Sequence, residues 1–250
     1  APASMSKMMT VYLLFEKLRA GEMHLTDLLP VSETAWKMQG SKMFVAVNSR
    51  VAVEDLIRGI AIQSGNDACI VVAEAISGSE ARFSDLMTQR AKELGLTGSN
   101  FTNSNGWPDP NDWSTAHDLA LLARRLIVDF PEYYHYFSEK EFTYNKIKQG
   151  NRNPLLYRNI GADGIKTGHI ESAGYGLTAS AKQGERRLIL VLHGMASMQE
   201  RDDEAVKMMS WGFREFDNRT LVKAGQAIEQ ADVWLGEQPR VSLTVDSDLT

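Results

Sequence analysis

The stretch that decides the fold is Ala1-Pro2-Ala3-Ser4-Met5-Ser6-Lys7-Met8-Met9-Thr10, which leads into an apolar run over residues 11–15. A helix that is apolar on almost every side is buried in a core rather than lying on a surface. Pro2 suits the first turn of such a helix, because proline has no N–H to lose there, and Gly21 suits its end. The sequence therefore predicts a buried helix that ends near Arg19.

Ser4 and Lys7 are three residues apart and would share one face of this helix. A hydroxyl beside an amine in an apolar setting can be a nucleophile with its base, because burial lowers the pKa of a lysine. A Ser-x-x-Lys pattern, however, occurs by chance about once in a chain of this length. The pair alone therefore does not decide the function.

The composition is typical of a globular protein with a sizeable core. The chain has 250 residues, 43% of them hydrophobic and 24% charged, and its net charge is -5. No block of Lys or Arg stands out, so nucleic acid is not an expected partner. No apolar stretch approaches the roughly 20 residues that cross a bilayer. The single cysteine, Cys69, excludes an internal disulfide and is expected to be a small buried side chain.

Helical patterns fill the first half of the chain and strand patterns follow. Helices are expected over residues 53–62, 68–76, 79–94, 115–127 and 201–216, and strands at residues 43–47, 142–145, 173–181, 188–192 and 241–245. This order of elements predicts an α+β layered domain with an antiparallel hairpin. Residues 97–113 are dense in Gly, Asn, Ser, Pro and Asp, which predicts a long ordered loop of the kind that is often functional.

Two further polar motifs follow Ser4 and Lys7 in the sequence. Ser64-Gly65-Asn66 lies in the break between two expected helices, and Lys166-Thr167-Gly168-His169 lies beside the expected hairpin. Each motif is weak alone, since Ser-Gly-Asn usually marks a turn and Lys-Thr-Gly a strand end. Ser-x-x-Lys, Ser-x-Asn and Lys-Thr-Gly in this order are the signature set of serine enzymes that recognise penicillin.

Over essentially its whole length the chain resembles the low-molecular-mass penicillin-binding proteins, the D-alanyl-D-alanine carboxypeptidases of the peptidase S11 family. The resemblance rests on residues 4–10, 56–59, 63–69, 151–153, 163–169 and 211–214. Gly65 within Ser-Gly-Asn and His169 after Lys-Thr-Gly are similar to that branch rather than to class A β-lactamases. The implied fold is the β-lactamase/transpeptidase-like sandwich of helices, an antiparallel sheet and a helix.

The resemblance assigns catalysis to Ser4, Lys7, Ser64 and Asn66. Ser4 would attack the carbonyl between two D-alanines, with Lys7 as its base. Ser64 would relay a proton to the leaving amine. Asn66 would bind the substrate amide and steady Lys7.

The resemblance assigns substrate binding to Lys166, Thr167, Gly168, His169 and Arg152. Lys166 and Thr167 would hold the terminal carboxylate, and Lys166 would lower the pKa of Lys7 by repulsion between like charges. The backbone N–H groups of Ser4 and His169 would form the oxyanion hole. Gly168 would leave room for a peptide along the strand, and Arg152 would support Lys166 or contact a carboxylate.

The implied function is removal of the terminal D-alanine from peptidoglycan stem peptides through an acyl-enzyme, with β-lactam antibiotics as acylating inhibitors. No cofactor and no metal are implied. The implied location is periplasmic or extracytoplasmic and peripheral to the inner membrane, through a C-terminal amphipathic anchor that this chain lacks.

Two alternatives stay open: a β-lactamase, and a non-hydrolytic β-lactam sensor or cell-wall-binding module. Glu141 and Asn145 have the spacing of the deacylating motif of class A β-lactamases, but they lie in a strand-like alternation. We interpret that match as coincidence.

The expected domains are residues 1–215, an N-terminally truncated serine D,D-peptidase domain, and residues 216–250, the start of a small β-rich domain. In the family, strands of the central sheet precede the nucleophile helix, whereas Ser4 is almost the first residue here. An unpaired sheet edge invites aggregation, and one strand cannot make a domain. The sequence therefore predicts a fragment that is not stable by itself.

Overall fold

The computed structural model describes residues 1–249, which divide into a unit from Ala1 to Ser210 and a second unit from Trp211 onward. In the first unit, a short 3-10 turn, η1 (Ala3–Ser6), leads into the central helix α1 (Lys7–Arg19). The expected buried helix is therefore present, although its first turn is a 3-10 turn. The domain boundary expected near residue 215 stays a prediction.

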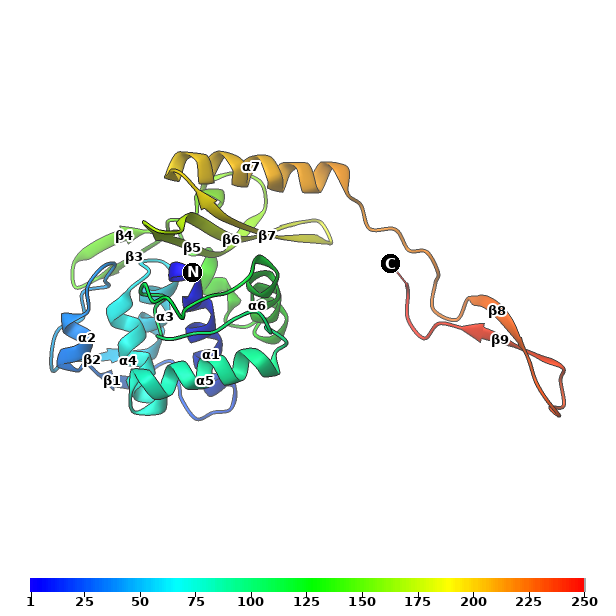
Figure 1. The fold of residues 1–250 in the computed structure, drawn as a ribbon, viewed down its shortest axis with the longest axis horizontal. Helices are drawn as coiled ribbons and strands as arrows, with labels where there is room; N and C mark the ends of the chain where they lie inside the picture. The colour runs from blue at the N-terminus through cyan, green and yellow to red at the C-terminus, as the bar shows by residue number, and fades with distance from the viewer. Residues whose placement is uncertain (250) are drawn as a thin grey trace. The chain divides into compact units, whose positions relative to one another are not determined.

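Five further helices surround α1 in this unit (Figure 1). They are α2 (Glu33–Lys37), α3 (Val53–Ala61), α4 (Asn66–Ser77), α5 (Glu80–Glu93) and α6 (Ala116–Asp129). Helices α5 and α6 begin after capping residues: the Ser79 and Thr115 hydroxyls accept hydrogen bonds from the third backbone N–H beyond them, at 3.3 and 3.0 Å. Two short strands, β1 (Leu28–Pro30) and β2 (Arg50–Ala52), pair beside these helices.

The sheet has three antiparallel strands in the order β5 (Ala162–Ile170), β6 (Gly174–Gln183) and β7 (Arg186–Met195). The expected hairpin is β6–β7, and its turn contains Gly184 with a positive φ of 57°. Helix α6 contacts β6 and β7 on one face, and residues 198–210 of α7 (Met198–Glu215) run along the other face (Figure 1). This helix–sheet–helix arrangement confirms the α+β class.

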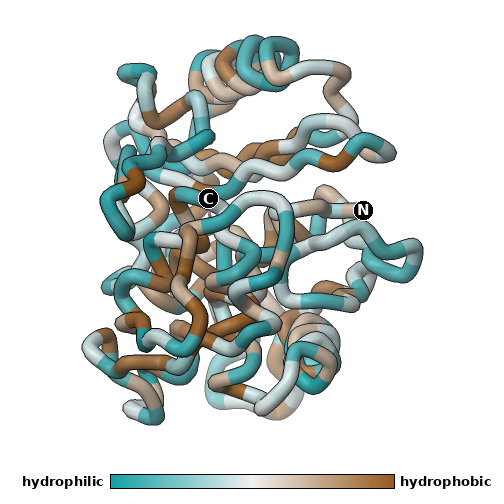
Figure 2. Tube along the Cα trace, turned by 90° about the vertical axis from the view of Figure 1, so that its left-hand side faces the viewer, coloured by the Kyte–Doolittle hydropathy of each residue, from teal (hydrophilic) through white to brown (hydrophobic). Residues whose placement is uncertain are grey.

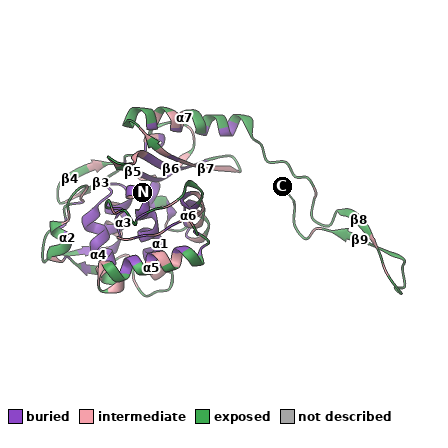
Figure 3. Ribbon diagram, in the orientation of Figure 1, coloured by how far each residue is buried: buried purple, intermediate pink, exposed green. Residues whose placement is uncertain are grey.

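The core of the first unit lies between the sheet and the helices beneath it. Apolar segments concentrate there, while the loops around them are hydrophilic (Figure 2). Helices α1 and α4 are buried along most of their length (Figure 3). The apolar positions Val53, Leu56, Ile57 and Ile60 of α3 are fully buried, as their helical spacing predicted.

Residues 43–47 do not form the expected strand. The Asp67 carboxylate accepts hydrogen bonds from the backbone N–H groups of Met43, Phe44 and Val45 at 2.9, 2.9 and 3.1 Å, and Phe44 has a φ of 68°. A side chain has thus taken the donors that a neighbouring strand would need. The expected strand at 142–145 is β3 (Glu141–Tyr144), which pairs with β4 (Ile147–Gly150).

The second unit contains one β-hairpin. Its strands are β8 (Ala227–Asp232) and β9 (Arg240–Thr244), both almost wholly exposed (Figure 3). The strand expected at residues 241–245 is β9, and its partner β8 was not predicted. Among residues 1–249, no helix has the length and apolar character of a bilayer-spanning segment.

Candidate active site

The Ser4–Lys7 pair lies where η1 passes into α1. Lys7 Nζ donates a hydrogen bond to Ser4 Oγ at 2.8 Å. The Lys7 side chain is fully buried, whereas Ser4 is half-buried and lines a surface hollow. The hydroxyl can therefore meet a ligand while its neighbouring amine stays shielded from water.

The environment of Lys7 increases the fraction of its neutral form. The pKa of Lys7 is lowered from 10.5 to about 8, chiefly by burial and further by repulsion from Arg152, while Cys69 and Asp67 act in the opposite direction. Lys7 Nζ also donates to the backbone carbonyl of Asn105 at 2.5 Å. An amine held in this way can accept the proton of the Ser4 hydroxyl near neutral pH.

Ser64 and Lys166 form a second polar pair. Ser64 lies in the break between α3 and α4 with a φ of 58°, and its Oγ accepts a hydrogen bond from Lys166 Nζ at 3.0 Å. Lys166 Nζ also donates to the carbonyl of Thr167 at 3.1 Å. Burial lowers the pKa of Lys166 well below its usual range, and repulsion from Lys7 and Arg152 adds to this effect. Burial is thus the main cause of the lowered pKa at both amines, and repulsion from Lys7 contributes at Lys166.

Strand β5 carries Lys166, Thr167, Gly168 and His169 past the nucleophile turn. A Cβ atom on Gly168 would lie 3.0 Å from the Pro2 carbonyl oxygen and 3.3 Å from Ala3 Cβ. Glycine therefore permits the strand to pack closely against η1. This close packing is a different reason for glycine here from the one expected from the sequence, which was room for the substrate. The His169 ring stacks on Tyr175 with centroids 3.9 Å apart.

Two hollows meet at Ser4. One, of about 320 Å³, is lined by Ser4, Ser41, Ser64, Arg152, Thr167, Gly168, His169, Tyr175, Met198 and Arg201. The other, of about 450 Å³, is lined by Ser4, Asn66, Trp107 and His169 among others. Seven of the nine residues singled out in the sequence line these hollows. The other two, Lys7 and Lys166, donate hydrogen bonds to the lining residues Ser4 and Ser64.

Comparison with known proteins identifies this arrangement. The sequence model of the D-alanyl-D-alanine carboxypeptidases, peptidase family S11, matches residues 1–197. The chain belongs to this family. It is 44% identical over 249 residues to D-alanyl-D-alanine carboxypeptidase DacC of Escherichia coli. The matched region covers 97% of this chain but only 62% of that relative.

Solved structures show the same S11 fold. Penicillin binding protein 5 from Haemophilus influenzae superposes with a TM-score of 0.90 at 42% identity, over 99% of this chain and 73% of that one. Penicillin-Binding Protein D2 from Listeria monocytogenes, solved in its ampicillin-bound form, superposes with a TM-score of 0.77 at 28% identity, over 85% of this chain and 86% of that one. The β-lactamase/transpeptidase-like sandwich expected from the motifs is confirmed.

Asn66 and Arg152 lie at the walls of this S11 site. Asn66 Nδ2 donates to the Gln39 carbonyl at 2.8 Å, and the expected contact between Asn66 and Lys7 stays a prediction. Arg152 Nη1 donates to Ser41 Oγ at 2.8 Å. Partial desolvation lowers the pKa of Arg152, although its side chain is exposed, and repulsion from Arg201 contributes. Two guanidinium groups near one hollow favour an anionic ligand there.

Sequence reasoning missed several residues of the site, among them Arg201, Asn105 and Gly106. Arg201, whose side chain is 5% exposed, comes from α7 and lines the hollow with Arg152, but no motif contains it. Asn105 and Gly106 come from the long loop, whose composition signalled function without indicating which residue matters. Gly106 has a φ of 74°, and a Cβ there would lie 1.9 Å from the Ala3 carbonyl oxygen.

Glu141, which mimics the β-lactamase spacing, lies on β3 and pairs with Lys148 of β4 at 2.7 Å. Both side chains are more than half exposed. This pair supports the interpretation that the spacing is a coincidence.

Proposed function

We propose that this protein is a serine-type D-alanyl-D-alanine carboxypeptidase that removes the terminal D-alanine from peptidoglycan stem peptides. The observation that carries the proposal is the 2.8 Å contact between Ser4 Oγ and Lys7 Nζ, since burial lowers the pKa of that lysine to about 8. The name of the E. coli relative and the S11 family description agree with this activity.

The reaction would begin with neutral Lys7 taking the proton of Ser4 as Oγ attacks the carbonyl carbon between the two D-alanines. The backbone N–H groups of Ser4 and His169 would stabilise the oxyanion. The C–N bond then breaks, and Ser64 would relay a proton to the departing amine. Water would hydrolyse the Ser4 ester and restore the hydroxyl.

The terminal carboxylate of the substrate would bind Lys166 and Thr167, with Asn66 on the peptide amide. The 3.0 Å hydrogen bond to Ser64 positions the Lys166 amine, and Arg152 adds positive charge beside it. The same groups would bind the carboxylate of a β-lactam, which would acylate Ser4. The ampicillin-bound Listeria relative supports β-lactams as inhibitors.

The substrate places this activity in the periplasm, in cell wall biogenesis and the maintenance of cell shape. We infer a peripheral attachment of the whole protein to the inner membrane through a C-terminal anchor. Retention of an extended full-length protein in washed membranes, with release on deletion of the anchor, would test that attachment.

Release of D-alanine from a diacyl-Lys-D-Ala-D-Ala peptide by the full-length protein tests the activity. Ser4→Ala should abolish both release and covalent labelling by a fluorescent penicillin. Rapid turnover of penicillin without D-alanine release would favour a β-lactamase. Stable acylation of Ser4 without D-alanine release and without hydrolysis of penicillin would favour a β-lactam sensor or binding module.

A further inference from the structure

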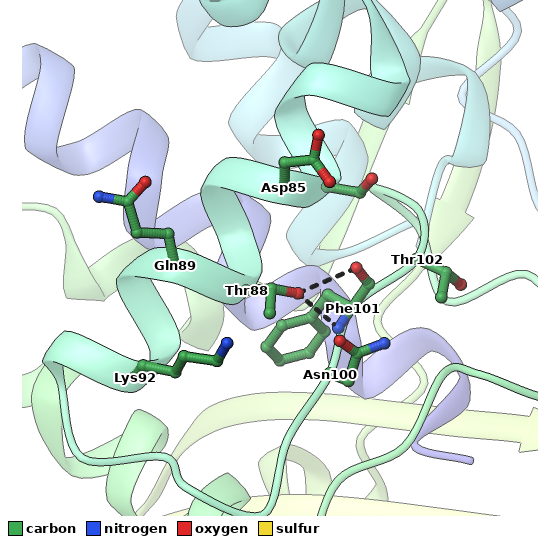
Figure 4. Close-up of a pocket in the computed structure, with 8 residues that line it drawn as sticks. Asp85, Thr88, Gln89, Lys92, Asn100, Phe101 and Thr102 are labelled. Atoms are coloured by element: carbon green, nitrogen blue, oxygen red, sulfur yellow. Dashed lines mark hydrogen bonds between the residues drawn. The ribbon is translucent and has the colours of Figure 1, made fainter.

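The segment before Asn105 is fastened to α5 at two points. The first is Thr88, whose Oγ1 donates to the Phe101 carbonyl at 3.1 Å and accepts from the Phe101 N–H at 2.9 Å (Figure 4). The two bonds close one wall of a groove whose other lining residues include Asp85, Gln89 and Lys92. They fix the start of the segment to the middle of α5.

The second point is Glu80, the first residue of α5. Its Oε1 atom accepts hydrogen bonds from the Ser104 backbone N–H at 3.1 Å, from Ser104 Oγ at 2.7 Å and from Asn105 Nδ2 at 3.4 Å. One carboxylate oxygen thus holds two consecutive residues of the loop.

The same two residues meet the nucleophile helix on their other side. Ser104 presents its carbonyl to Thr10 Oγ1 at 2.5 Å, and Asn105 presents its carbonyl to Lys7 Nζ at 2.5 Å. Lys7 and Thr10 lie one turn apart on α1. Ser104 and Asn105 are therefore clamped between Glu80 on α5 and two side chains of α1.

Gly106 of the loop apex packs against Ala3, and the other hydrogen bonds of the apex come from its own side chains. The Trp107 N–H donates to Asn103 Oδ1 and to Asn105 Oδ1, each at 2.9 Å. Such local bonds keep the shape of the turn but do not fix where the turn sits. Glu80 is the side chain that ties the apex to a helix on the side away from α1.

We propose that Glu80 is a positioning residue for Lys7: through Ser104 and Asn105 it fixes the carbonyl that holds the Lys7 amine against Ser4. The inference rests on the proposed role of Lys7 as the base. The titratable groups around Lys7 are Cys69, Asp67 and Arg152, with Lys166 beside them. Glu80 bonds to Ser104 and Asn105 and has no direct bond to Lys7, so we expect it to act through the position of the loop.

The experiment compares three full-length variants in acylation by a fluorescent penicillin across pH 6–10. Glu80→Ala frees the apex and admits water to Lys7, so acylation should slow by about tenfold or more, since small misplacements of catalytic groups cost that much. The pH midpoint should rise by about half a unit or more, because burial is what lowers the pKa of Lys7. Glu80→Gln keeps the Oε1 acceptor and should restore both values. Asp85→Ala, an exposed carboxylate on the same helix, is the matched control and should match the parent.

The inference is overturned if Glu80→Ala acylates as fast as the parent. It is also overturned if Glu80→Ala acylates more slowly but with an unchanged pH midpoint, or if Glu80→Gln acylates no faster than Glu80→Ala. Rates are normalised to folded protein measured by circular dichroism, so a general loss of structure does not count as support. If the parent itself neither acylates nor releases D-alanine, the proposed function fails rather than the role of Glu80.

Discussion

Acylation of Ser4 should accelerate with pH and level off above pH 9, because the neutral amine of Lys7 is the proposed base. Burial lowers the pKa of Lys7 from 10.5 to about 8. At pH 7 about one molecule in ten then carries the neutral amine, and at pH 9 about nine in ten, so the rate should rise roughly tenfold. A lysine with its usual pKa would give a rise of roughly 100-fold over the same range with no plateau.

Removing a neighbouring cation should move this midpoint. Repulsion from Arg152 contributes to the lowered pKa of Lys7, so Arg152→Gln should shift the midpoint to higher pH. Arg158→Gln, an exposed arginine six positions away, is the matched control and should leave it in place. Ionic strength is held constant, because salt screens such interactions.

The assay is rapid-quench acylation by a saturating fluorescent penicillin between pH 6 and pH 10. Saturation separates acylation from carboxylate binding, for which we propose Lys166. Circular dichroism at each pH confirms that the protein stays folded. A rate that is independent of pH from 7 to 9, one that still climbs at pH 10, or a downward shift in Arg152→Gln would refute this account of the base.

Three further changes have defined expectations. Lys166→Ala should lower kcat/KM for the peptide by a factor that corresponds to several kcal/mol of transition-state stabilisation, since it removes an oriented charge-assisted contact. Loss of an exposed lysine would cost under about 1 kcal/mol, so near-parent turnover would contradict its role. Asp67→Asn should reduce the free energy of unfolding by about 3 kcal/mol in urea titrations, because buried N–H donors lose their acceptor; a loss below about 0.5 kcal/mol would be that of a surface position. Gly106→Ala should slow acylation about tenfold or more, as its Cβ would displace the Ala3 carbonyl beside Ser4; an unchanged rate would show that the turn adapts.

The local structure could be read from the sequence where neighbours along the chain decide it. The apolar spacing of α3 and the Thr115 cap of α6 act within one or two turns, so their positions were predictable. The β6–β7 hairpin was predictable because a glycine turn joins its strands directly. The three polar motifs were informative through their order along the chain, although each was weak alone.

What the sequence could not give depends on contacts between distant segments. Asp67 decides that residues 43–47 are not a strand, because it binds their N–H groups from more than twenty residues away. Strand β9 pairs with β8, and no local sequence pattern predicted this pairing.

The candidate site shows the same division. The sequence by itself determined which chemical groups are available: the hydroxyls of Ser4 and Ser64 and the amines of Lys7 and Lys166. Only the tertiary structure decided their protonation, because the pKa of an amine depends on burial and on charges that other segments bring near it. It also decided which carbonyl meets Lys7, since Asn105 lies 98 residues further along the chain.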